Sequence, residues 1–93
     1  MIERTGGHLS VTAPMVISTA TALLEAGNAL LTEKEETVDL QAVPEADSSA
    51  LAVMLAWMRA AQAAGRQLHF ANAPAAITAL ADLYGVDEIL MPG

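Results

Sequence analysis

The segment from Ser48 to about Ala64 constrains the fold more than any other part of the chain. It contains no glycine or proline, it is rich in alanine, leucine and methionine, and Gly65 follows it, so we predict a helix. Its apolar side chains form two stripes along the helix. Because one sheet face cannot bury both stripes, we expect a neighbouring helix to cover the second stripe, with a protein partner as the alternative. The first stripe comprises Leu51, Met54, Leu55 and Met58, and the second comprises Ala50, Val53, Trp57 and Ala61.

Strand-like and helix-like segments alternate around this helix. Residues 2–4 and 9–12 alternate apolar with polar side chains on either side of Gly6-Gly7, which predicts an antiparallel hairpin. The alternation that follows predicts right-handed crossovers and a partly parallel sheet. The further expected elements are a helix over 20–31 capped by Ser18 or Thr19, strands over 37–40 and 67–71, a helix opened by Asn72 and Pro74 with Ile77, Leu80, Ala81 and Tyr84 on one face, and a tail, Val86–Gly93, forming a short strand or an ordered arm.

Length and charge exclude several classes of function. A chain of 93 residues predicts a single domain, 1–93, with little room for an enclosed active site. A net charge of −7 argues against binding to nucleic acid and against direct docking on anionic lipid. There is no cysteine, targeting segment or long apolar run, so we expect a cytoplasmic protein without disulfides or direct membrane insertion.

Patterns typical of catalysis and metal binding are missing from the sequence. It has no glycine-rich phosphate loop, no Gly-x-Ser-x-Gly and no His-Glu-x-x-His. His8 and His69 are expected in separate strands without a carboxylate at ligand spacing, so we predict no metal and no cofactor. Asp39 and Asp47 could approach each other at the end of the third strand, but no pocket-forming aromatic residues accompany them. We therefore expect a protein that is not an enzyme and has no small-molecule substrate.

The segment Asp47-Ser48-Ser49 places an acid and two hydroxyls at the start of the long apolar helix. In one interpretation, Asp47 or Ser48 caps the helix by accepting a hydrogen bond from a free N–H group of its first turn. In the other, Ser48 is a phosphate acceptor, because the unpaired amides of a helix N-terminus stabilise added negative charge. The segment alone leaves both interpretations open.

The spacing from Val38-Asp39-Leu40 through Val43 to Asp47-Ser48-Ser49 resembles that of STAS domains, the family of anti-sigma-factor antagonists. Within that family the chain is most similar to the MlaB group, the small STAS subunits of a bacterial phospholipid ABC transport system. The agreement includes Leu80-Ala81 and Leu83-Tyr84 in the last helix. Ala50 and Ala13-Pro14 depart from the antagonist pattern, which has glycine and a Gly-Glu pair there.

The resemblance implies an α/β STAS-like fold with a mixed four- to five-stranded sheet and helices packed on one side. It implies a non-enzymatic subunit that binds and regulates a cytoplasmic ATPase of the MlaF type, and through it a permease, in a complex that maintains outer-membrane lipid asymmetry. The chain would then be peripheral to the inner membrane only through its partner. The alternative is a phospho-regulated anti-sigma-factor antagonist. The resemblance implies Ser48 as possible phospho-acceptor, Asp47 and Ser49 beside it, and Asp39 as a matching motif position. From the residues we add Ala52 and Trp57, so the expected partner surface comprises Asp47, Ser48, Ser49, Ala52 and Trp57.

Overall fold

The chain begins with a β-hairpin. The computed structural model describes residues 1–92, and its first two strands, β1 (Ile2–Thr5) and β2 (His8–Val11), pair antiparallel with Ile2 opposite Val11. Gly6 at the turn has a φ of 61°, a backbone conformation that glycine adopts without steric cost. The predicted hairpin is therefore confirmed.

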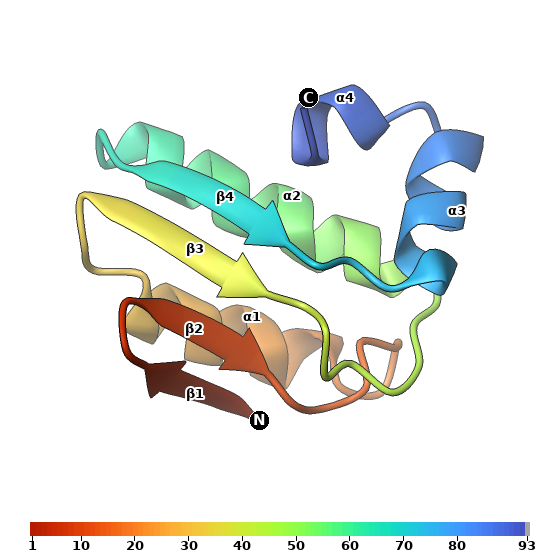
Figure 1. The fold of residues 1–93 in the computed structure, drawn as a ribbon, viewed down its shortest axis with the longest axis horizontal. Helices are drawn as coiled ribbons and strands as arrows, with labels where there is room; N and C mark the ends of the chain where they lie inside the picture. Colours follow the sequence, from red (N-terminus) through yellow and green to blue (C-terminus); the bar gives the residue numbers. More distant parts are fainter. Residues whose placement is uncertain (93) are drawn as a thin grey trace.

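The sheet is mixed and has four strands in the order β1-β2-β3-β4. β3 (Glu35–Asp39) is parallel to β2, and β4 (Gln67–Ala71) is parallel to β3. Each crossover thus moves one strand further in the same direction. Right-handed crossovers of this kind place both connecting helices on the same face of the sheet, and Figure 1 shows α1 (Ala20–Leu30) and α2 (Ser49–Ala63) together there. The predicted mixed sheet with helices on one side is confirmed.

The core lies between the sheet and these two helices, and α1 covers the second stripe of α2. Trp57 is 1% exposed, and its indole Nε1 donates a hydrogen bond to the carbonyl oxygen of Leu24 at 3.3 Å. Gly27 provides the space for the indole, since an added Cβ would overlap the ring. The sequence-based expectation of a helix neighbour is confirmed, and the interior of the fold, not a partner protein, covers this stripe.

The C-terminal part differs from expectation. Residues of the tail predicted as a strand or ordered arm form a short helix, α4 (Asp87–Leu90), whose Leu90 is buried. Two acids in the first turn of α4 suit a helix N-terminus. The prediction for the tail was therefore wrong over 87–90, and Gly93 lies outside the described residues.

Two details of the predicted helices also need correction. α3 (Ala75–Leu83) buries Ile77 and Ala81 as expected, but Tyr84 follows the helix and is 59% exposed. The Thr19 side chain makes no capping hydrogen bond to α1. Its hydroxyl instead donates to the carbonyl of Pro14 at 2.6 Å, so it stabilises the preceding loop.

Within residues 1–92, none of the helices combines the length and the apolar character that crossing a bilayer requires.

Candidate functional site

Asp47 holds together two segments at the start of α2. Its Oδ1 accepts a hydrogen bond from the backbone N–H of Ser49 at 2.8 Å, and its Oδ2 accepts one from the N–H of Ile17 at 3.1 Å. The bond from Ser49 lowers the pKa of the carboxyl, and with the bond from Ile17 it outweighs the opposing effect of desolvation. The sequence left open whether Asp47 or Ser48 caps α2. In the structure, the Asp47 carboxylate makes the capping hydrogen bond.

The loop before α1 joins this arrangement through the backbone as well. Met15 and Ala46 form a parallel bridge, in which the Met15 N–H donates to the Glu45 carbonyl at 2.9 Å and the Asp47 N–H donates to the Met15 carbonyl at 3.1 Å. Met15 is buried, so the loop cannot shift without disturbing the core. The exposed Ile17 side chain is thereby held beside the start of α2.

Ser48 is exposed at the N-cap position of α2, and its hydroxyl makes no capping hydrogen bond. The hydroxyl is therefore not needed to begin the helix. Ser49 is half-buried next to it, and Ala52 is exposed one turn further along. Four of the five residues predicted for the partner surface, Asp47, Ser48, Ser49 and Ala52, thus lie together at one end of α2.

A shallow apolar groove of about 350 Å³ lies beside Ser48, between α2 and the end of α3. Leu83, next to Tyr84 in the chain, is 77% exposed, and Ile17 beside Asp47 is also 77% exposed. Large apolar side chains that remain exposed in a small protein mark a surface suited to a partner. The groove is lined by Ser48, Leu51, Ala52, Leu55, Tyr84 and Val86.

Sequence reasoning missed Ile17, Leu83 and Tyr84. Ile17 precedes α1 and Leu83 is the last residue of α3, and neither is among the apolar positions expected on the buried faces of these helices. This was the signal that could have identified them as exposed. Tyr84 was assigned to the buried face because it follows Ile77 and Ala81 at helical spacing, but the helix ends before it.

Two other residues that the sequence singled out lie away from this surface. Trp57 is buried against α1, so the prediction that it belongs to an exposed partner surface was wrong. Asp39 Oδ1 accepts hydrogen bonds from the Gln41 N–H at 2.9 Å and from Asn72 Nδ2 at 3.3 Å. Asp39 therefore joins the loops that follow β3 and β4. The two aspartates that the sequence brought into consideration together, Asp39 and Asp47, share no hydrogen-bonding partner.

The two histidines are strand residues, as predicted. His8 lies in β2 and His69 in β4, and both alternate with buried residues, which places them on the face of the sheet opposite α1 and α2. Among the described residues, no group of three or more histidines and carboxylates has an arrangement that could hold a metal ion.

The family model described as "Mlab, STAS domain" matches residues 2–92, nearly the whole chain. The chain belongs to the MlaB-type STAS domain family. A comparison with curated protein sequences finds no match.

Solved structures share the fold of this STAS domain at low sequence identity. The anti-sigma factor antagonist SpoIIAA in its unphosphorylated form has a TM-score of 0.75 and 11% identity, with 98% of this chain and 84% of that chain covered. A sulfate transporter family protein from Wolinella succinogenes has a TM-score of 0.69 and 16% identity, with 87% and 67% covered. A protein designated Mglu has a TM-score of 0.59 and 22% identity, with 76% of this STAS domain and 19% of that chain covered. At these identities the likeness concerns the fold.

Proposed function

We propose that this STAS domain is a non-enzymatic subunit that docks on the cytoplasmic ATPase of an ABC phospholipid transport complex and regulates it. The observation that carries the proposal is the apolar groove beside Ser48, because it joins a family motif to exposed apolar surface. The chain would reach the inner membrane only through this partner, and the complex would maintain outer-membrane lipid asymmetry.

The composition of the groove supports a protein partner. Ser48 and Ala52 are small and exposed, so a partner backbone can approach α2 closely. Tyr84 lines the groove with a large exposed side chain, and the exposed Ile17 lies beside Asp47. A few large side chains surrounding small ones is the arrangement in which a minority of residues carries most of the binding energy. Tyr84 here provides the large side chain of the docking surface, because Trp57, which the sequence had placed there, is buried.

Substitution of Ser48 tests this surface. The chain is first used to capture its partner from the native host, and the partner is identified by mass spectrometry as an ABC ATPase or as another protein. Calorimetry with the purified ATPase then compares wild type with Ser48→Glu. A carboxylate desolvated at the interface should weaken binding by about 2–5 kcal/mol, or roughly thirtyfold to several-thousandfold.

Asn28→Glu is the matched control, because Asn28 is exposed on α1 and the substitution introduces the same charge. We expect it to leave the affinity for the ATPase nearly unchanged. Equal affinity of the wild type and Ser48→Glu would place the docking surface elsewhere. Capture of proteins that do not include an ABC ATPase would contradict the proposed function itself.

A second function, a phospho-regulated anti-sigma-factor antagonist, is favoured by one observation. Ser48 is exposed at the N-terminus of α2 and makes no capping bond, so a kinase could reach its hydroxyl without disrupting the helix. Incubation with ATP and a captured anti-sigma kinase should then add about 80 Da at Ser48, the mass of one phosphate group. An unmodified Ser48 after incubation with that kinase would exclude this function.

A further inference from the structure

β4 is an edge strand, and the backbone hydrogen-bonding groups of two of its five residues face away from the sheet. The Gln67 N–H donates to the Lys34 carbonyl, and the Ala71 carbonyl accepts from the Leu40 N–H, so residues 67, 69 and 71 bond to β3. In a parallel ladder the alternate residues, Leu68 and Phe70, present their N–H and C=O groups to the free edge. Among residues 1–92, no loop, cap or side-chain hydrogen bond reaches these groups.

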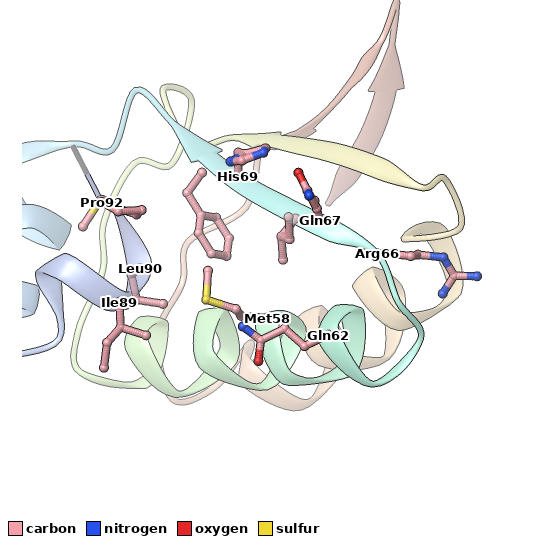
Figure 2. Close-up of a pocket in the computed structure, with 11 residues that line it drawn as sticks. Met58, Gln62, Arg66, Gln67, His69, Ile89, Leu90 and Pro92 are labelled. Carbon is pink, nitrogen blue, oxygen red and sulfur yellow. The ribbon is translucent and has the colours of Figure 1, made fainter.

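A groove of about 360 Å³ follows this free edge. Figure 2 shows Met58 and Gln62 of α2 on one side of β4 and Gln67 and His69 on the other. The C-terminal segment closes one end of the groove, and Arg66 stands at the other. The lining is completed by Leu68, Phe70, Ile89, Leu90, Met91 and Pro92.

The shape of the groove suits an extended peptide. Side chains of a strand point alternately to opposite faces, so a strand added to β4 would place one set against Met58 and Phe70 and the other set beside His69. Its backbone would pair with the outward groups of Leu68 and Phe70. Addition of a strand to an exposed sheet edge is a common mode of peptide recognition, in which backbone bonds give affinity and side-chain pockets give specificity.

The charge of the groove indicates the chemistry of the peptide. Arg66 and His69 line it and no carboxylate does, although the chain as a whole carries a charge of −7. Within residues 1–92 the only ion pair joins Arg4 to Glu36, so Arg66 has no carboxylate partner there. Glu35, opposite Gln67 in the ladder, lies on β3 outside the groove. An acidic ligand is therefore complementary to this edge.

A second copy of the chain fits this edge less well. Symmetric antiparallel pairing about the centre of β4 would bring His69 opposite its own copy and would join two chains of charge −7. We infer that an extended acidic segment of a partner protein binds the β4 edge as a fifth strand. Its apolar side chains pack against Met58, Phe70 and Ile89, and a carboxylate pairs with Arg66. The inference does not depend on the Ser48 surface.

A labelled short synthetic peptide that alternates valine with aspartate and glutamate serves as the probe, and the same peptide with lysine in place of the acids is its control. Fluorescence anisotropy at low salt measures binding. The acidic peptide should bind, and Arg66→Glu should weaken binding by about tenfold or more. Arg59→Glu is the matched variant, because Arg59 is an exposed arginine on the preceding helix, α2, and does not line the groove. It should change the affinity much less.

Hydrogen exchange distinguishes strand addition from simple charge attraction. The Leu68 and Phe70 amides should exchange quickly in the free protein and slowly with the acidic peptide, whereas the Gln67 amide is already bonded to β3. No binding, equal effects of Arg59→Glu and Arg66→Glu, or unchanged exchange at Leu68 and Phe70 would each overturn the inference. Protection of these two amides that grows with protein concentration in the absence of peptide would identify a second copy instead.

Discussion

The indole of Trp57 occupies the space that a side chain at position 27 would fill. An added Cβ on Gly27 would overlap Nε1, Cε2 and Cζ2 of the ring, and the indole is buried and rigid. α1 and α2 therefore approach closely at this one point, and the Trp57 Nε1 hydrogen bond to Leu24 holds the ring in place. Gly27 and Trp57 therefore form a close contact between the two helices.

Gly27→Ala should destabilise the protein, although alanine is the better helix former. The overlap with Trp57 forces the ring or the helix to move, and overpacking of this kind costs about 1–3 kcal/mol. Urea unfolding measures the change. Gly7→Ala is the control, since an added Cβ there meets nothing within 4 Å, and its effect should stay within about 0.5 kcal/mol. Equal stability of the Gly27 variant and wild type would contradict the close packing.

Trp57 should behave as a core residue in solution. As the single tryptophan of the chain, it should fluoresce at shorter wavelength than free tryptophan, resist quenching by acrylamide and shift to longer wavelength on unfolding. Trp57→Ala should lower the free energy of unfolding by about 3–5 kcal/mol, because it leaves a large cavity. Strong quenching in the native protein would show that the indole is exposed.

Glu36 should make stability depend on acidic pH. It is 2% exposed, and burial alone raises its pKa, but hydrogen bonds from Arg4 and from the N–H groups of Glu33 and Thr32 outweigh burial and lower the pKa below the ordinary 4.5. The ionised form is thus favoured in the folded state. Its contribution is fully present above the unfolded pKa and is lost as pH falls through the lower folded pKa.

Unfolding free energies measured at pH 7 and at about pH 4 and below test this dependence, with Glu36→Gln as the comparison. The variant should be less stable at pH 7, because the Arg4 guanidinium loses its charged partner. It should also lose less stability than wild type on acidification. Parallel pH profiles of the two proteins would show that Glu36 does not carry the effect.

Asp47 and Ser48 should differ in their effects on stability although they are neighbours. Asp47→Ala removes the acceptor for the Ser49 and Ile17 N–H groups and should lower the thermal midpoint. Ser48→Ala removes a hydroxyl that makes no capping bond and should change stability by less than about 0.5 kcal/mol. Thermal unfolding of both variants measures the contrast. A larger loss for Ser48→Ala would assign the cap to the serine.

Much of the fold could be predicted from the sequence because it is encoded in local patterns. The hairpin at Gly6-Gly7, the long helix before Gly65 and the strand at Leu68 all follow from periodicity and turn residues close together in the chain. The family motif placed Asp47, Ser48, Ser49 and Ala52 on one helix end for the same reason, and their common location needed no long-range information.

Only the tertiary structure decided which apolar residues are buried. Trp57 and Tyr84 both lie at helical spacing with core residues, yet one packs against Gly27 and the other remains exposed after the end of α3. The placement of Ile17 beside Asp47 and the free edge of β4 depend on contacts between segments far apart in the sequence. The sequence by itself determined the family and the elements up to α3, because these follow from patterns of neighbouring residues, whereas α4 was not predicted. Burial and the free sheet edge were decided by packing, because both depend on what the rest of the chain leaves uncovered.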